Sequence, residues 1–171
     1  PTTFCSGCGC GTVLSAFAQS LEELHVAPED VICVTGIGCS SWIPSPYFRC
    51  DTLHTTHGRA IAFASGVKVA RPDLEVVVIA GDGDLAGIGG NHLIHAARRN
   101  VSLTVICVNN FTYGMTGGQL APTSLLGMKT TTTPRGREYD EYGAPMKVSE
   151  LLSGLDGDAY SARHSLTTPG N

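Results

Sequence analysis

Two polar turns in the sequence carry oxygen ligands just after apolar runs. Asp82 stands in a Gly-Asp-Gly-Asp turn after the run Glu75–Ala80, and Asn110 follows the run Leu103–Val108. If both runs are strands of one parallel sheet, these side chains lie at its carboxyl edge, where open α/β sheets bind ligands. The Asp82 carboxylate, the Asn110 amide oxygen and the Thr112 carbonyl suit Mg²⁺, which prefers hard oxygen ligands and keeps positions for phosphate and water.

The glycines of the first turn favour a phosphate beside this metal. Gly81 and Gly83 let the backbone approach a diphosphate closely, and the N-terminus of a following helix favours negative charge. An ordinary strand–helix turn with capping side chains is the alternative. The sequence holds neither a G-x-G-x-x-G fingerprint in the required context nor a P-loop, so dinucleotide and P-loop sites are disfavoured.

Cysteine thiols form a second group of candidate ligands. The chain has seven cysteines, an odd number that is hard to reconcile with a disulfide framework. Cys5 and Cys8 have C-x-x-C spacing among glycines, and Cys39 lies in a second glycine-rich loop. A 4Fe-4S cluster, a structural zinc ion and uncommitted thiols all remain open, with Cys10 or Cys50 as a possible fourth ligand.

The other cysteines and the apolar runs indicate a packed α/β core. Cys33 and Cys107 are each flanked by Val and Ile, so we expect both thiols to fill the core. Alternation of strand-like and helix-like runs predicts a βαβ unit in a mostly parallel sheet. We expect helices over Gly11–Leu24, Ala60–Ala70, Gly89–Arg99 and Val148–Leu152, strands over Val31–Val34, Glu75–Ala80 and Leu103–Val108, and a long loop over Thr112–Gly136.

Composition excludes two classes of function. A formal net charge of −4 leaves no basic surface for nucleic acid, and no apolar run approaches the length needed to span a bilayer. The chain opens without the features of a signal peptide, and its cysteines suit a reducing compartment, so we expect a cytoplasmic protein. We expect one domain over 1–171 with a cysteine-bearing region at 1–50, and a C-terminus that stops short of the natural one.

Five motifs in order give the chain a specific resemblance. The Cys5-x-x-Cys8 opening, Gly36-Ile-Gly-Cys39-Ser, His54-Thr-Thr-His57-Gly-Arg, Gly81-Asp-Gly-Asp84 and the stretch from Asn109 to Gln119 resemble the β subunit of the 2-oxoacid:ferredoxin oxidoreductases. The resemblance covers residues 4 to about 136. It implies a three-layer thiamine-diphosphate-binding fold of the diphosphate-binding type.

The same resemblance implies roles for particular residues. Asp82, Asn110 and the Thr112 carbonyl would hold Mg²⁺, His57 would lie near the reacting carbons, and Cys5, Cys8 and Cys39 would be three ligands of a 4Fe-4S cluster. The fourth ligand would come from beyond this chain, so the cluster would be incomplete here unless Cys10 or Cys50 substituted. Residues implied to line the cofactor are Gly38, Cys39, His57, Gly81, Asp82, Gly83, Asp84, Asn110, Thr112, Tyr113, Gly114, Met115 and Thr116.

The implied reaction is CoA-dependent oxidative decarboxylation of a 2-oxoacid, with thiamine diphosphate as cofactor and ferredoxin as electron acceptor. An α subunit would supply the glutamate that activates the aminopyrimidine, in a heterodimer or a dimer of heterodimers. The Met115 and Lys129 regions resemble those of members that use 2-oxoglutarate, and Arg59, Lys129, Arg135 or Arg137 could bind its second carboxylate. The alternatives are a non-oxidative thiamine-diphosphate decarboxylase or synthase subunit, and a zinc-binding interaction module.

Overall fold

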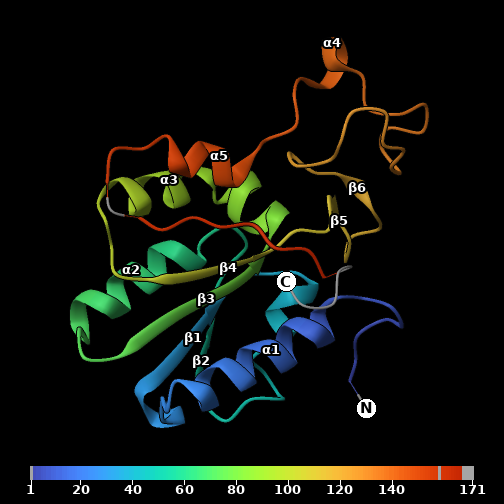
Figure 1. Ribbon diagram of the computed structural model, residues 1–171. Helices are drawn as coiled ribbons and strands as arrows, with labels where there is room; N and C mark the ends of the chain where they lie inside the picture. Colours follow the sequence, from blue (N-terminus) through green and yellow to red (C-terminus); the bar gives the residue numbers. More distant parts are fainter. Residues whose placement is uncertain (1, 158, 167–171) are drawn as a thin grey trace.

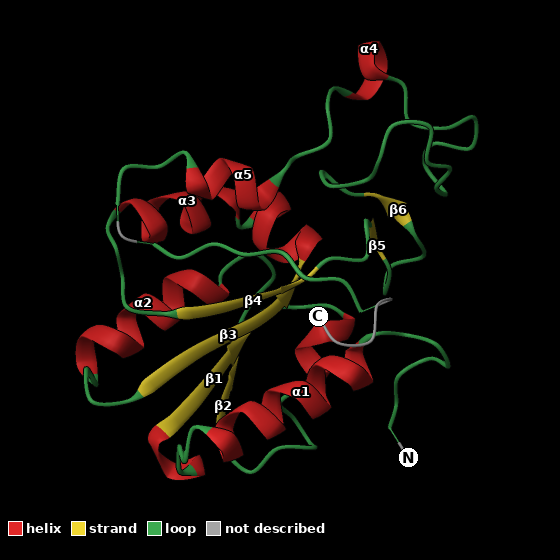
Figure 2. Ribbon diagram, viewed as in Figure 1, coloured by secondary structure: helices red, strands yellow, loops and turns green. Residues whose placement is uncertain are grey.

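The computed structural model describes residues 2–157 and 159–166. The prediction that the C-terminus stops short of the natural one concerns residues outside these ranges. A parallel sheet with strand order β2-β1-β3-β4 forms its centre (Figures 1 and 2). The strands are β1 (Val31–Thr35), β2 (Asp51–His54), β3 (Glu75–Gly81) and β4 (Thr104–Val108), and an antiparallel pair joins β5 (Thr112–Tyr113) to β6 (Gln119–Leu120). The α-helices are α1 (Cys10–Glu23), α2 (Ala60–Ala70), α3 (Gly90–Arg98), α4 (Tyr139–Tyr142) and α5 (Val148–Ser153).

Helices cover both faces of the sheet, which gives three layers (Figure 1). Successive strand side chains point to opposite faces. On β3, Val77 and Ile79 pack in one apolar cluster with Phe17 of α1, whereas Val76, Val78 and Ala80 pack in another with residues of α2, α3 and α5. The uninterrupted apolar run of this strand therefore reflects burial on both faces, as expected for a central parallel strand.

Most of the predicted elements are confirmed. Helix α2 has the predicted bounds, and the other predicted helices and strands occur within a residue or two. Strand β2 was not predicted, because it has only four residues of mixed polarity and forms by pairing with β1 at the sheet edge. Short 3₁₀ turns η1 (Pro28–Asp30) and η2 (Cys39–Trp42) were also not predicted.

The turn after β3 differs from the prediction. Instead of a loop before a helix at Gly89, residues Gly83–Ile88 form a π-helical turn, η3, that runs into α3. The wide turn is closed by the N–H of Gly89, which donates to the Asp84 carbonyl at 2.9 Å. π-Helical turns are rare and concentrate at functional sites, and this one lies at the carboxyl end of the central strand.

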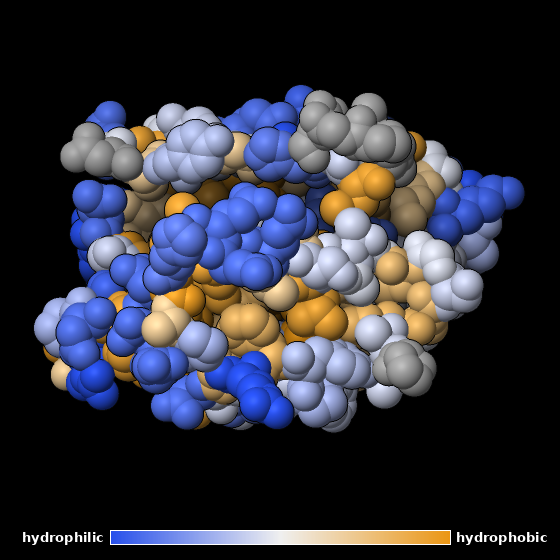
Figure 3. All heavy atoms as spheres, turned by 60° about the horizontal axis from the view of Figure 1, so that its bottom comes forward, coloured by the Kyte–Doolittle hydropathy of each residue, from blue (hydrophilic) through white to orange (hydrophobic). Residues whose placement is uncertain are grey.

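The segment from 112 to 147 extends away from the sheet, on the side of the strands' carboxyl ends (Figures 1 and 2). Strands β5 and β6 lie within the loop predicted over Thr112–Gly136, and α4 follows that loop. The face in Figure 3 shows a band of hydrophobic residues between hydrophilic ones. Within the described ranges, no helix combines the length and apolarity that a bilayer crossing requires.

Candidate functional site

The Asp84 carboxylate is the anchor of one half of the site. It is almost completely buried, and its Oδ1 accepts hydrogen bonds from the Gly58 backbone N–H at 2.6 Å and from Nδ1 of His57. His57 follows β2 and Asp84 follows β3, so the contact joins two strand ends. Gly36, at the end of β1, makes room for the carboxylate, because a Cβ there would lie 1.9 Å from Asp84 Oδ2.

The Asp82 carboxylate is the anchor of the other half. It is 1% exposed, and its Oδ2 accepts a hydrogen bond from the hydroxyl of Thr123. Burial raises the pKa of Asp82, because it disfavours the charged form, while the Thr123 hydroxyl and neighbouring backbone N–H groups oppose the shift. A buried carboxylate of this kind is expensive for the protein unless a cation compensates it.

The end of β4 brings further predicted residues to the same edge. The Asn110 side chain accepts a hydrogen bond from the Thr112 backbone N–H at 3.2 Å. Gly114 lies close to both Asn110 and Cys39, since a Cβ added to it would be 3.1 Å from Asn110 Nδ2 and 4.0 Å from Cys39 Sγ. The loop after β1 and the loop after β4 are therefore neighbours in space.

Tyr113 covers the π-helical turn. A Cβ on Gly83 would lie 2.3 Å from Tyr113 Cε1, and one on Gly87 would lie 2.3 Å from its hydroxyl oxygen. Burial and the nearby charges of Asp82 and Asp84 raise the pKa of this tyrosine. Its ring also meets His57 edge-on, with centroids 6.1 Å apart. The glycines are thus needed for ring packing as well as for close approach of a ligand.

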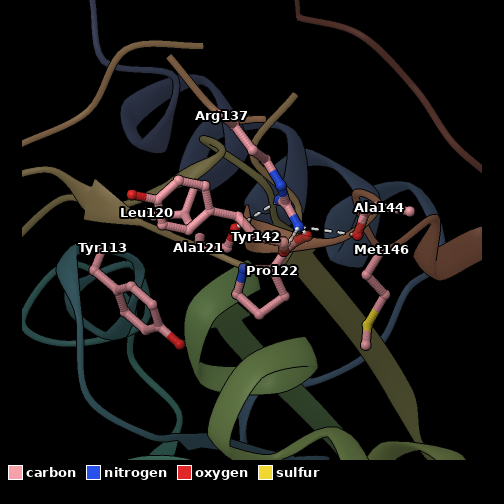
Figure 4. Close-up of a pocket in the computed structure, with 8 residues that line it drawn as sticks. All are labelled: Tyr113, Leu120, Ala121, Pro122, Arg137, Tyr142, Ala144 and Met146. Carbon is pink, nitrogen blue, oxygen red and sulfur yellow. Dashed lines mark hydrogen bonds between the residues drawn. The ribbon is translucent and has the colours of Figure 1, made fainter. Parts of the chain in front are cut away.

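A cavity of about 420 Å³ opens beside Tyr113 (Figure 4). Its wall includes Leu120, Pro122, Tyr142 and Met146 from the extended segment. Other predicted cofactor residues lie further along this segment: Met115 is 51% exposed, and Thr116 bonds within its own turn to the carbonyl of Tyr113 and the side chain of Gln119.

Three buried oxygens at this edge lack a hydrogen-bond partner among the described residues: Ser40 Oγ, Asp82 Oδ1 and Asp84 Oδ2. Ser40 is close to Gly81, whose Cβ would lie 3.5 Å from its hydroxyl oxygen. Native proteins leave few buried polar groups without a partner, and such groups commonly bind a ligand, a water or an ion. Two carboxylate oxygens and a hydroxyl suit a hydrated cation with its anionic ligand, so the residues present fit Mg²⁺ and a diphosphate.

The predicted cluster cysteines lie near one another without forming a closed site. Cys5 and Cys8 are exposed, and the N–H of Cys8 donates to the Cys5 carbonyl at 3.0 Å. Burial raises the pKa of Cys39, and the charges of Cys8 and Cys5 raise it further. Within the described part of the chain, no three His, Cys, Asp or Glu side chains are arranged to hold a metal ion.

Cys10 and Cys50, the two candidates for the fourth cluster ligand, have different surroundings in the structure. Cys10 begins α1, is buried, and has a pKa raised to about 12 by burial and by its contact with Cys8. Cys50 instead pairs with Cys33, with the two sulfurs 3.3 Å apart. Cys33 and Cys107 belong to the two apolar clusters, which confirms the prediction that they fill the core.

The Cys33–Cys50 pair leads to a prediction about thiol reactivity. The hydrogen bond with Cys50, together with burial, raises the pKa of Cys33 and keeps it protonated, and the same hydrogen bond lowers the pKa of Cys50 to about 7. Iodoacetamide should therefore alkylate Cys50 with a midpoint near that pH, since the thiolate is the nucleophile. In Cys33→Ala the midpoint should rise towards the ordinary value of about 8.5. Peptide mass spectrometry across a pH series measures both, and an ordinary midpoint in the unmodified protein would contradict the assignment.

The contacts of Arg137 do not support the sequence-based suggestion that this residue binds a substrate carboxylate. Its guanidinium is buried and donates to six backbone carbonyls. Arg135 and Lys129 are exposed, and Arg59 donates to His92 Nε2 at 2.7 Å. Sequence reasoning gave no individual role to Gly36, Ser40 or Thr123. Only tertiary packing brings Gly36 and Thr123 close to the site carboxylates and Ser40 close to Gly81.

A comparison with protein families matches residues 36–167 to the thiamine pyrophosphate enzymes, in their C-terminal TPP-binding domain. The chain belongs to this family. The match begins at Gly36, directly after β1, and covers β3, β4 and the turns after them that carry Asp82, Asp84 and Asn110. It confirms the fold class predicted from the sequence, a three-layer α/β fold around a parallel sheet.

Relatives of this thiamine pyrophosphate domain carry a consistent name. The "2-oxoglutarate synthase subunit KorB" of Methanocaldococcus jannaschii is 63% identical over 136 residues, covering 80% of this chain and 50% of the relative. The protein of the same name from Methanothermobacter marburgensis is 54% identical over 169 residues, covering 99% and 57%. The family resemblance predicted from the motifs is confirmed, and the chain spans about half the length of these curated relatives.

A solved structure shares the fold. The 2-oxoglutarate:ferredoxin oxidoreductase of Magnetococcus marinus, determined with 2-oxoglutarate, coenzyme A and succinyl-CoA bound, superposes with a TM-score of 0.81 at 44% identity. The match covers 89% of this chain and 50% of that one.

Proposed function

We propose that this chain holds the diphosphate and metal half of thiamine diphosphate in the β subunit of a CoA-dependent 2-oxoacid:ferredoxin oxidoreductase. The proposed substrate is 2-oxoglutarate, and the products are an acyl-CoA, CO₂ and reduced ferredoxin. The three buried oxygens without partners at the carboxyl edge of the sheet carry the proposal. Within a thiamine pyrophosphate domain, they have the chemistry that a magnesium diphosphate requires.

In this proposal, Asp82 and Asn110 bind Mg²⁺ through side-chain oxygens and Thr112 through its carbonyl. Gly38, Gly81, Gly83 and Gly114 allow the backbone to approach the cofactor, and Tyr113 closes over the turn. Thiamine diphosphate would supply the carbanion chemistry needed to cleave the bond next to the carbonyl. The contribution of the protein is to bind and orient the cofactor and to limit access of water.

His57 is proposed as the catalytic residue of this chain. Its Nδ1 contacts the buried Asp84, which fixes the ring and leaves Nε2 as the nitrogen that can hold or move a proton. The side chain is 33% exposed and so remains accessible to a substrate.

Replacing His57 with Gln should lower 2-oxoacid turnover about 100-fold or more, as loss of a general acid–base group does. Affinity for thiamine diphosphate should change little, because His57 lies on the Asp84 side of the site and not among the proposed metal ligands. Steady-state kinetics and cofactor titration of the same preparation separate the two effects. A variant that loses cofactor affinity and keeps its turnover would exclude the catalytic role.

The electron-transfer half of the proposal rests on the cysteines. Cys5, Cys8 and Cys39 would bind a 4Fe-4S cluster, with a fourth ligand from outside the described residues. Support comes from the Cys5–Cys8 turn and from the electrostatic coupling of both thiols to Cys39. All seven cysteines are unpaired by disulfides, which agrees with the proposed cytoplasmic location.

The partner subunit and the substrate are proposed for the whole protein and not for this chain alone. The proposed partner is an α subunit that carries the glutamate activating the aminopyrimidine, in a heterodimer or a dimer of heterodimers. Names of relatives support 2-oxoglutarate, and the Magnetococcus marinus enzyme binds 2-oxoglutarate and coenzyme A. Exposed Met115, Leu125 and Leu126 on the extended segment are consistent with a surface that a partner covers.

The test is an assay of the intact complex under anaerobic conditions. With 2-oxoglutarate, CoA, thiamine diphosphate and Mg²⁺, we expect reduction of a viologen dye, together with iron and acid-labile sulfide in the purified protein. Comparing kcat/KM for 2-oxoglutarate, pyruvate, branched-chain and aryl 2-oxoacids decides the substrate. Decarboxylation without dye reduction or iron would favour a non-oxidative enzyme, and zinc without a thermal shift on cofactor addition would favour a binding module.

A further inference from the structure

Arg137 is a buried cation bound entirely by backbone carbonyls. The residue is 5% exposed, and burial lowers the pKa of its guanidinium. Its acceptors fall in two short segments, 121–124 and 142–144, which Arg137 ties together (Figure 4). Nη1 donates to Ala121 at 3.2 Å, Pro122 at 3.0 Å and Ser124 at 2.7 Å, Nη2 to Tyr142 at 3.1 Å and Ala144 at 2.9 Å, and Nε to Gly143 at 3.1 Å.

The 121–124 turn reaches the candidate metal site through two hydroxyl groups. Thr123 donates to Asp82 Oδ2, which leaves Oδ1 as the buried oxygen without a partner. Ser124 Oγ accepts from the Ala121 N–H at 2.9 Å and donates to the Phe111 carbonyl at 2.5 Å, next to Asn110. One turn therefore contacts both strand ends that carry the proposed Mg²⁺ ligands.

Polar contacts hold this turn, which lies outside the two apolar clusters of the sheet although Ala121 itself is buried. Among the described residues, neither apolar cluster of the sheet includes any member of 121–124 or 142–144. A guanidinium has fewer N–H groups than the six carbonyls it meets here, so its hydrogen-bonding capacity is used up. Arg137 thus has no N–H group left to donate to a substrate. Its geometry instead suits a link between two backbone segments.

We infer that Arg137 and Thr123 are positioning residues for the Asp82 carboxylate. Arg137 fixes the turn, the turn places the Thr123 hydroxyl on Oδ2, and that hydrogen bond keeps Oδ1 directed to the metal. The inference rests on the proposed function, since it takes Asp82 as a Mg²⁺ ligand. Loss of a residue that orients a metal ligand typically lowers metal affinity about 10- to 100-fold.

The test measures metal affinity directly in the intact protein with its partner subunit. Mn²⁺, a paramagnetic substitute for Mg²⁺, is added in steps in the presence of thiamine diphosphate, and EPR measures the concentration of free Mn²⁺. Thr123→Val should weaken Mn²⁺ binding about 10- to 100-fold, whereas Thr123→Ser, which keeps the hydroxyl, should restore most of it. Thr104→Val, an exposed threonine on β4, is the matched control and should bind like the unmodified protein.

Arg137→Lys should also weaken Mn²⁺ binding. A lysine ammonium lacks the planar array of N–H groups with which the guanidinium reaches the carbonyls of both segments. The double variant of Arg137→Lys with Thr123→Val should bind Mn²⁺ about as tightly as the weaker-binding single variant, because both substitutions act on one contact. Hydrogen exchange should rise at 121–124 in Arg137→Lys while β1 and β3 keep their protection. Arg71→Lys, exposed and far from the site, is the control for the loss of a guanidinium.

Unchanged Mn²⁺ affinity in both Thr123→Val and Arg137→Lys would overturn the inference. A rise in KM for the 2-oxoacid at constant Mn²⁺ affinity would overturn it in favour of substrate binding, and a lower Tm alone would do so in favour of a purely structural role. These results differ from failure of the proposed function, in which the unmodified protein itself would bind no Mn²⁺ with thiamine diphosphate.

Discussion

Replacing Asp82 with Asn should weaken Mg²⁺-dependent binding of thiamine diphosphate by at least about 100-fold, because even partners that only orient a ligand are worth 10- to 100-fold. Asp82 is the only charged side chain among the proposed Mg²⁺ ligands, and its free oxygen is buried. Asn keeps the size of the side chain and loses the charge. Isothermal titration with thiamine diphosphate, at fixed Mg²⁺, measures the loss.

The same change should raise the stability of the cofactor-free protein at neutral pH. Burial raises the pKa of Asp82 above its ordinary value of 3.8. The native state therefore binds a proton more tightly than the unfolded state, and the stability that this gives is lost as pH rises through the native pKa. At neutral pH the buried charge is a cost that Asn removes, and below about pH 4 the advantage of the variant should disappear.

Thermal unfolding of both proteins without cofactor, between acid and neutral pH, checks this sign. Adding thiamine diphosphate and Mg²⁺ should then stabilise only the unmodified protein, because a ligand stabilises the state that binds it. An Asp82→Asn protein that is less stable at neutral pH would show that Asp82 serves the fold instead of a ligand.

Replacing Gly36 with Ala should destabilise the protein by about 1–3 kcal/mol, the usual cost of overpacking a filled interior. The new Cβ would lie 1.9 Å from Asp84 Oδ2 and 2.6 Å from Cγ. Asp84 cannot move away freely, because Gly58 and His57 hold its other oxygen. Either these contacts break or the end of β1 shifts, and both outcomes disturb the site.

Gly66→Ala provides a control of opposite sign. Gly66 lies inside α2, and a Cβ there would meet no atom within 4 Å. Alanine should stabilise a helix at such a position by about 0.5–1 kcal/mol. Urea denaturation of the two variants tests the pair, and equal effects would show that the contact between Gly36 and Asp84 is not tight.

The motifs identified most of the site because they are local. Asp82 and Asn110 each follow an apolar run, and parallel strands bring their carboxyl ends to one edge whatever the details of packing. The same reasoning placed α2, β3 and the core cysteines, whose apolar neighbours report burial directly. It failed at β2, which exists through pairing with β1 and not through its own sequence.

The sequence alone thus determined the family and the parallel α/β core, and it supplied the residues proposed to bind a magnesium diphosphate, because each depends on short-range pattern. Only the tertiary structure decided that Thr123 bonds to Asp82, that Arg137 bonds to the 121–124 turn, that His57 contacts Asp84, and that Cys50 pairs with Cys33. These contacts join residues far apart in the chain. Their partners are chosen by how the layers pack, and no local spacing records that choice.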